Sequence, residues 1–201
     1  MSKLVIGLGS GRSGSQSLAK LLSAQKNACF THELLPIPWT DGDPELRQVI
    51  AYFRAKLSGY DLVGDSASYY LPYVEHLLET FPESKLICLE RDRADTVKSF
   101  LAKTGLHHNW LPNNGVSWRI NLVWDSTFPK YPIEDKKEAI GRYWDEYYNR
   151  ARDLAERHPG NFAIFKLAEL NHEAGQKAIL TFLGITDPIL APGVKANALL
   201  S

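Results

Sequence analysis

The chain has 201 residues, about the size of one domain with a substantial core, so we expect residues 1–201 to form a single domain. Its 23 lysine and arginine residues balance 23 aspartate and glutamate residues, which excludes the strong positive field of a typical nucleic-acid-binding protein. No apolar run reaches transmembrane length, and the first one begins too near Met1 for a signal peptide, so we expect a cytoplasmic protein with no membrane partner.

The first predicted elements are a buried strand at residues 4–6, a glycine-rich turn at residues 7–14 and a helix that begins near Ser15. Ser15 is expected to cap this helix, whose apolar residues recur at i, i+3 and i+4. Glycines allow positive φ angles, and the free N–H groups of a first helical turn attract anions. Arg12 adds a positive charge and a planar set of donors, so this stretch predicts a site for a phosphate-like anion.

The turn is close to a Walker A sequence but departs from it in two respects. Ile6 stands where the first glycine is required, and Arg12 replaces the lysine. The sequence therefore predicts an anion site that differs from the standard nucleotide loop of a kinase or an ATPase.

Apolar and amphipathic runs predict further strands and helices along the rest of the chain. The strands are expected at residues 28–31, 60–64, 85–89 and 162–165, and the helices at residues 44–57, 70–80, 94–103, 134–158 and 172–183. Asp43 is expected to cap the helix that starts at Pro44, and Gly184 to end the last helix. Cys29 and Cys88 lie in predicted strands and are expected to be buried free thiols.

Strands that alternate with helices predict an α/β fold, with a central, mostly parallel five-stranded sheet flanked by helices as in P-loop NTPases. Polar residues follow four of the predicted strands, namely Arg12, His32 with Glu33, Asp65 and Arg91. Ligands of such sheets bind beyond the carboxyl ends of the strands. We therefore expect these side chains to lie at one shared site.

The stretches GSGRSGSQSL at residues 9–18 and LERDRADTVKS at residues 89–99 form two motifs in a fixed order. The first resembles the 5′-phosphosulfate loop of the sulfotransferases that use 3′-phosphoadenylyl sulfate (PAPS). The second resembles the 3′-phosphate motif of the same family, and it keeps the spacing of eight residues from Arg91 to Ser99. Weaker similarities to this family follow in order along nearly the whole chain.

The resemblance implies that PAPS is the sulfuryl donor, that it is released as 3′-phosphoadenosine 5′-phosphate (PAP), and that no metal ion is needed. It gives Arg12 the role of stabilising the leaving oxygen, and it gives Arg91 and Ser99 that of holding the 3′-phosphate. The residues implied to surround the 5′-phosphate are Gly11, Arg12, Ser13, Gly14, Ser15 and Gln16. The expected acceptor is a hydroxyl or amine of a small molecule or a carbohydrate.

Two residues are candidates for the base that takes the acceptor's proton. Some members of the sulfotransferase family that the chain resembles have a catalytic glutamate at the position of Glu33, so we prefer Glu33 as the base. His32 is the alternative, because its ordinary pKa is nearer neutral. Four residues are weaker candidates for acceptor contact: Asp65, Trp39, His107 and His108. Asp65 has an alternative, structural role in orienting a loop.

Residues 34–44 and 104–134 read as loops and are expected to form the acceptor pocket, since loops at strand ends provide specificity. They hold four tryptophans, at least one of which is expected in the core: Trp39, Trp110, Trp118 and Trp124. Ser17 stands where cytosolic members of the resembling family stack an aromatic residue on adenine. Residues 193–195 are only a faint match to that family's C-terminal phosphate motif.

Two other functions stay open at this point. A P-loop kinase of a small metabolite would use ATP with Mg²⁺, and Asp65 would then hold the metal or act as the base. The missing Walker lysine argues against this function. A nucleotide-binding protein without catalysis would bind PAP but would sulfate no acceptor. The sequence does not predict an oligomeric state.

Overall fold

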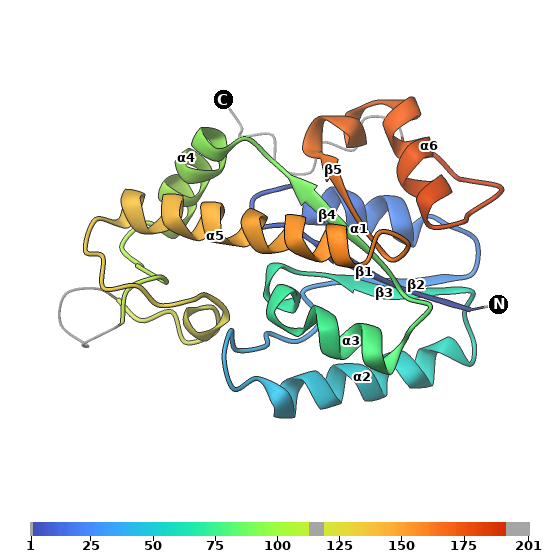
Figure 1. Ribbon diagram of the computed structural model, residues 1–201, viewed down its shortest axis with the longest axis horizontal. Coiled ribbons are helices and arrows are strands. Elements are labelled where there is room, and N and C mark those ends of the chain that lie inside the picture. The colour runs from blue at the N-terminus through green and yellow to red at the C-terminus, as the bar shows by residue number, and fades with distance from the viewer. Residues whose placement is uncertain (1, 113–118, 192–201) are drawn as a thin grey trace.

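All five predicted strands are present, and they pair in parallel in one sheet (Figure 1). The computed structural model describes residues 2–112 and 119–191. The strands are β1 (Lys3–Leu8), β2 (Ala28–His32), β3 (Leu62–Ser66), β4 (Lys85–Glu90) and β5 (Phe162–Lys166). Their order in the sheet is β2-β3-β1-β4-β5, so β1 lies at the centre. This confirms the predicted α/β fold with a parallel sheet.

Helices cover both faces of the sheet (Figure 1). They are α1 (Ser15–Ser23), α2 (Asp43–Leu57), α3 (Val74–Thr80), α4 (Arg93–Thr104), α5 (Lys136–Arg157) and α6 (Glu173–Phe182). Helices α2, α3 and α5 share a buried cluster with one face, and α1 and α6 share another with the opposite face. Along β1, Leu4 and Ile6 belong to the first cluster and Val5 to the second, as the alternation of a strand requires.

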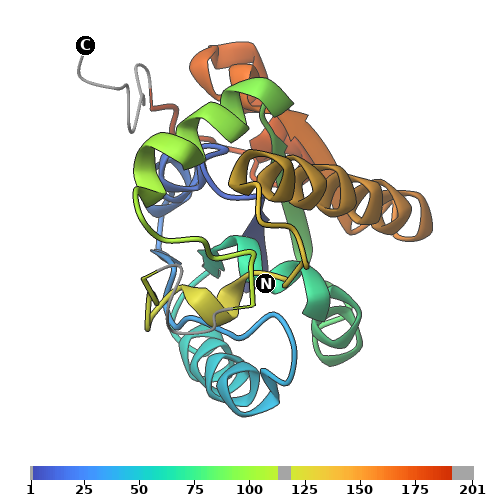
Figure 2. The same cartoon turned by 90° about the vertical axis from the view of Figure 1, so that its left-hand side faces the viewer.

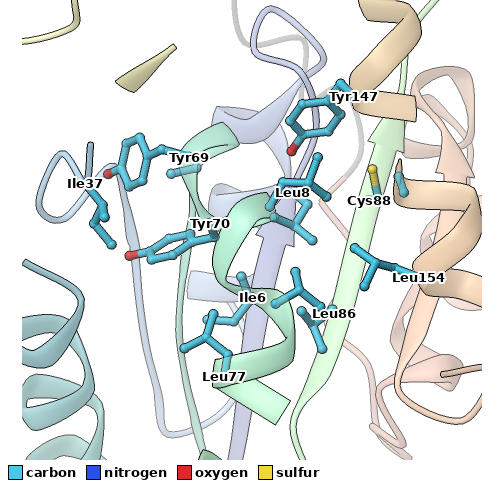
Figure 3. Close-up of a cluster of buried hydrophobic side chains, with 14 of the residues drawn as sticks. Ile6, Leu8, Ile37, Tyr69, Tyr70, Leu77, Leu86, Cys88, Tyr147 and Leu154 are labelled. Atoms are coloured by element: carbon cyan, nitrogen blue, oxygen red, sulfur yellow. The ribbon is translucent and has the colours of Figure 1, made fainter. Parts of the chain in front are cut away.

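The larger core cluster packs α5 against the ends of the central strands (Figure 3). Tyr147 of α5 and Leu8 of β1 belong to this cluster, and so does Cys88 of β4. Both cysteines are free, as predicted. Cys88 is fully buried, whereas Cys29 is only half-buried because its strand lies at the edge of the sheet.

The two predicted helix caps, Ser15 and Asp43, are each wrong by one residue. Gly14, with a φ of 94°, takes the cap position of α1, and Ser15 is the first helical residue. Gly42 takes the cap position of α2, so the helix begins at Asp43. In both cases the residue before the expected cap is a glycine, which occupies the cap position without a side-chain hydrogen bond.

The predicted helix at residues 70–80 has two parts, because Pro72 interrupts it. A 3₁₀ helix spans Ser68–Tyr73, and α3 follows. Proline has no N–H and its ring clashes with the preceding turn of an α-helix, so regular α-helix begins only after it. At the other end of the chain, Gly184 follows α6 with a φ of 67°, which confirms the predicted helix stop.

Between α4 and α5, the described residues 105–112 and 119–135 form no helix or strand apart from a 3₁₀ turn at Asp125–Thr127, as predicted for a loop. This segment and α4 face the viewer in Figure 2, on the side where the strands end. A third 3₁₀ helix, Leu167–Asn171, follows β5 at the same side of the sheet. Within residues 2–112 and 119–191, no helix is long and apolar enough to cross a membrane.

Candidate active site

The glycine-rich loop between β1 and α1 forms the floor of the site. Its backbone has positive φ angles at Gly9, Gly11, Arg12 and Gly14. Glycine is required at Gly11 because the Phe100 ring lies directly over it, and a Cβ atom there would come within 2.8 Å of that ring. Arg12 has a Cβ atom, so its left-handed backbone conformation is strained and costs about 1–2 kcal/mol.

Two tyrosines of α5 bind this loop from below. The N–H of Gly9 donates to the Tyr147 hydroxyl (3.0 Å), and the N–H of Ser10 faces the Tyr148 hydroxyl (3.4 Å). The Tyr148 hydroxyl in turn donates to the carbonyl of Leu89 at 2.7 Å, which joins the loop to β4. Burial raises the pKa of both phenols, so they stay protonated and able to donate.

A cluster of two arginines and a serine lies above the loop, between β1 and β4. Arg12 Nε donates to Ser99 Oγ (3.0 Å), and Arg91 donates to the carbonyl of Arg12 (3.0 Å). The Arg91 carbonyl accepts from Trp144 of α5 at 3.1 Å, which fixes the end of β4. Within the described residues, neither arginine forms an ion pair with a carboxylate.

These two arginines repel each other. Burial and the charge of Arg91 both lower the pKa of Arg12, while the charge of Glu33 opposes the shift. Two guanidinium groups held near one another beside a serine hydroxyl have the donors and the charge to bind a dianion. The residues present therefore fit the phosphate groups of a nucleotide such as PAPS.

His32 and Glu33 lie at the end of β2, opposite the start of α1. Ser15 Oγ is 2.9 Å from His32 Nε2, and His32 Nδ1 is 3.6 Å from Glu33 Oε2. Burial raises the pKa of Glu33, and the charge of Asp65 raises it further, whereas His32 and Arg12 lower it. The backbone of Glu33 is also in the left-handed conformation, with a φ of 55°. A carboxylate of raised pKa near an anion site has the properties of a general base.

One cavity of about 830 Å³ connects these groups. Its floor is the glycine-rich loop with Arg91, His32 and Glu33. One wall comes from the 3₁₀ helix after β5 and includes Leu167, Leu170 and Asn171. The opposite wall comes from α4 and the irregular segment: Phe100, Lys103, Thr104, His107, Asn109, Asn121, Trp124 and Phe128. The cavity thus has room for a nucleotide and for a second molecule.

Most of the predicted nucleotide-binding residues come together here. Gly11, Arg12, Gly14, Ser15, Gln16 and Arg91 line the cavity, and so do His32 and Glu33. Ser13 does not line it, because its side chain is fully buried beneath the loop, against the position of Gly9. Ser99 is also buried and reaches the cavity only through its hydrogen bond to Arg12.

The predicted acceptor-contact residues separate in the structure. His107 lines the cavity, whereas Asp65, Trp39 and His108 do not. Trp39 packs against the rings of Tyr143 and Tyr147. Burial lowers the pKa of His108, and the charge of Lys136 lowers it further.

The predicted tryptophans of the acceptor pocket also separate. Trp110 is fully buried in an aromatic cluster, so at least one tryptophan is in the core as expected. Trp124 lines the cavity. Trp118 and residues 193–195 lie outside the described residues.

Several cavity residues were missed in the sequence. Asn109, Asn121 and Phe128 belong to an irregular segment without periodicity, so no pattern indicates which side chains turn inward. Asn109 is only 4% exposed, and its Oδ1 has no hydrogen-bond partner among the described residues. Tyr147 and Tyr148, whose hydroxyl groups contact the loop, were not among the predicted site residues. Their hydroxyl groups within a buried stripe were a signal, because buried tyrosine hydroxyls need partners.

Comparison with known proteins gives three findings. A family model described as a sulfotransferase domain matches residues 4–195. The crystal structure of a sulfotransferase from Alicyclobacillus acidocaldarius aligns with 98% of this chain and 86% of its own, at 15% identity and a TM-score of 0.56. A sugar kinase from Janibacter aligns with 98% of this chain and 100% of its own, at 17% identity and a TM-score of 0.47, too low to support a conclusion. No curated protein sequence matches the chain.

Proposed function

Because this chain belongs to the sulfotransferase family, we propose that it transfers a sulfuryl group from PAPS to a hydroxyl or amine of a small molecule or a carbohydrate. The observation that most strongly supports PAPS as the donor is the cluster of charged groups at the loop. Arg12, Arg91 and Ser99 form a positively charged cluster beside a glycine-rich loop at a helix N-terminus. Such a site has donors for the phosphates at both ends of the nucleotide.

PAPS would supply the activated sulfuryl group, and the chain would supply its binding and the proton transfer. Gly14, Ser15 and Gln16 line the cavity at the start of α1, and the N–H groups of this first helical turn suit the 5′-phosphate. Arg91 suits the 3′-phosphate, with a charge-assisted contact worth about 1.5–3 kcal/mol, while the buried Ser99 supports this part of the site through its hydrogen bond to Arg12. Arg12 lies beside Arg91 and Ser99 and lines the same cavity, and its charge would stabilise the oxygen that leaves.

Glu33 is the residue that we propose as the base. Both ring nitrogens of His32 have side-chain neighbours, Ser15 on one side and Glu33 on the other. The Glu33 side chain lines the cavity and is 37% exposed, so it is accessible to an acceptor. In this arrangement, the His32 ring lies between Ser15 at the start of α1 and the Glu33 carboxylate. Its polar Nδ1 side helps to keep the carboxylate in place.

The wall formed by α4 and the irregular segment suits the acceptor. Trp124 and Phe128 offer aromatic faces, and Asn109 and Asn121 add amide groups to the same wall. Asn121 Oδ1 already accepts from the N–H groups of Val123 and Trp124, so Asn121 offers its NH₂ group as a donor. Asn109 Oδ1, which has no partner among the described residues, can accept a hydrogen bond from an O–H or N–H group. This combination fits a ring that bears hydroxyl groups, such as a sugar or a phenol.

The contacts of Asp65 argue against the alternative function as a kinase, in which Asp65 would hold Mg²⁺ or act as the base. The Asp65 carboxylate accepts hydrogen bonds from Thr31, Leu34 and Tyr70 and does not line the cavity. It is therefore committed to the protein rather than to a metal or a substrate. A protein that binds nucleotide without catalysis stays the second alternative, and the transfer assay below distinguishes it.

Calorimetric titration with PAP, AMP, ATP and ATP with Mg²⁺ tests the donor. We expect PAP to bind without metal. Arg91→Ala should lower the affinity for PAP by about 10- to 150-fold and should have a smaller effect on the affinity for AMP. Arg93→Ala is the matched control, because Arg93 pairs with Asp145 and does not line the cavity. Binding of ATP only with Mg²⁺ would instead support a kinase.

A second assay separates an enzyme from a binding protein. Radiolabelled PAPS is incubated with a panel of phenols, amino sugars and oligosaccharides, and sulfated products are separated and counted. Transfer to any member supports the proposed reaction. PAP binding with no transfer across the panel would favour a nucleotide-binding protein that has lost catalysis.

A further inference from the structure

Asp65, at the end of β3, is a fully buried carboxylate without an ion-pair partner among the described residues. Its Oδ1 accepts from the Thr31 hydroxyl (2.8 Å). Its Oδ2 accepts from the Tyr70 hydroxyl (2.8 Å) and from the backbone N–H of Leu34 (3.1 Å). Three neutral donors thus hold one negative charge inside the protein.

One of these donors belongs to the turn at Glu33. The left-handed conformation of Glu33 is held on both sides, by its own N–H bonded to the Ser66 carbonyl (3.2 Å) and by the N–H of Leu34 bonded to Asp65. β3 therefore supplies both contacts that fix the direction of the Glu33 side chain. Because the Leu34 contact is made by a side chain, a single substitution removes it.

We propose that Asp65 is a positioning residue for Glu33, acting through the backbone N–H of Leu34 and through its own buried charge. This inference rests on the proposed function, in which Glu33 is the base. The turn places the Glu33 carboxylate in the cavity, and the negative charge behind it increases its affinity for a proton. A base that holds a proton more strongly takes it from an acceptor more readily.

Four charged or titratable groups surround Glu33. His32 precedes it on β2, Arg12 faces it from the glycine-rich loop, Asp65 lies behind it on β3, and Tyr69 belongs to the 3₁₀ helix that follows β3. Arg12 and a protonated His32 lower the pKa of Glu33, and Asp65 is the group whose negative charge raises it. Removal of that charge is therefore expected to lower the pKa of Glu33.

Asp65→Asn removes the charge and can keep the geometry. An asparagine oxygen can still accept from Leu34 and Tyr70, and its NH₂ group would then face Thr31. The Thr31 hydroxyl can receive that hydrogen bond because it already lies 3.2 Å from the Gly64 carbonyl, to which it can donate. Asp65→Ala, in contrast, removes the partner of the Leu34 N–H as well.

The decisive measurement is the titration of Glu33 itself by carbon NMR on protein labelled at the glutamate carboxyl carbon. Loss of one resonance in Glu33→Gln identifies the signal. We expect its midpoint to move to lower pH in Asp65→Asn and to stay in place in Tyr70→Phe, which removes a donor but not the charge. An unchanged midpoint in Asp65→Asn would overturn the role of the charge.

Hydrogen exchange of the Leu34 amide tests the other half of the inference. Exchange should be faster in Asp65→Ala and nearly unchanged in Asp65→Asn, and equal protection in both would overturn it. Asp65→Ala should also lower kcat about 10- to 100-fold, with the KM for PAPS unchanged. If the wild-type chain binds no PAP, the proposed function fails, but the titration and the exchange still decide whether Asp65 positions Glu33.

Discussion

The loops after β1 and β2 each hold a charged residue in the left-handed conformation, but they do so by different means. Arg12 and Glu33 both have a φ of 55°. Arg12 lies between Gly11 and Gly14, whose own positive φ angles shape the loop locally. Glu33 has no neighbouring glycine, and its turn depends on hydrogen bonds from β3. The first conformation is therefore encoded nearby in the sequence, and the second by contacts from elsewhere in the fold.

This difference separates the tasks of the two loops. In the proposed function, the glycine-rich loop brings several N–H groups to an anion, which glycines allow at little steric cost. The loop at Glu33 must hold one carboxylate at one position, which requires support from a rigid neighbour. Substitutions in the two loops should therefore change different properties of the protein.

The largest effect is expected for Glu33→Gln. Removal of the base should lower the rate of sulfuryl transfer by about 10²- to 10⁴-fold and leave PAP affinity unchanged. In the wild type, burial raises the pKa of Glu33, and the base acts when deprotonated, so the rate should rise with pH through a value above the usual range for glutamate. Rates of transfer measured across pH check both points, and full activity in the variant would assign the base elsewhere.

The next effect is expected for Gly9→Ala, which breaks the locally encoded loop. A Cβ atom there would lie 2.2 Å from Ser13 Oγ and 2.8 Å from the Leu89 carbonyl, at a φ of 148°. We expect the free energy of unfolding to fall by about 2–4 kcal/mol in urea denaturation. Gly160→Ala is the control, since a Cβ atom at Gly160 meets nothing within 4 Å. Equal midpoints for the two variants would contradict the claim that this loop requires glycine.

The same distinction explains what could be predicted from the sequence. The loop at the cavity around Arg12 was predictable because its glycines, its arginine and the start of α1 are neighbours in the chain. The parallel sheet followed from periodicity, and it placed Glu33 and Arg91 at the same edge. The partners of the loops were not predictable, because the Gly9–Tyr147 contact spans 138 residues and the Leu34–Asp65 contact spans 31.

Tyr147→Phe tests one of these distant partners. The substitution leaves the N–H of Gly9 buried without its acceptor, which should cost about 1–3 kcal/mol of unfolding free energy. It should also weaken PAP binding, because the loop loses its contact with α5. Tyr60→Phe on the surface should change stability by less than about 0.5 kcal/mol. If both variants match the wild type in urea and in PAP titration, α5 does not hold the loop.

The smallest effect, and the sharpest test of the difference between the loops, is expected for Glu33→Asn. Asparagine tolerates the left-handed conformation better than glutamate or glutamine, because its short side chain can hydrogen-bond locally. Glu33→Asn should therefore be more stable than Glu33→Gln by about 0.5–1 kcal/mol in urea denaturation, although both lack the base. Such a gain would mean that the fold maintains a strained turn at Glu33 in order to place its carboxylate in the cavity. Equal stability would mean that the contacts from β3 already offset the strain, so that the chain holds its base without a loss of stability.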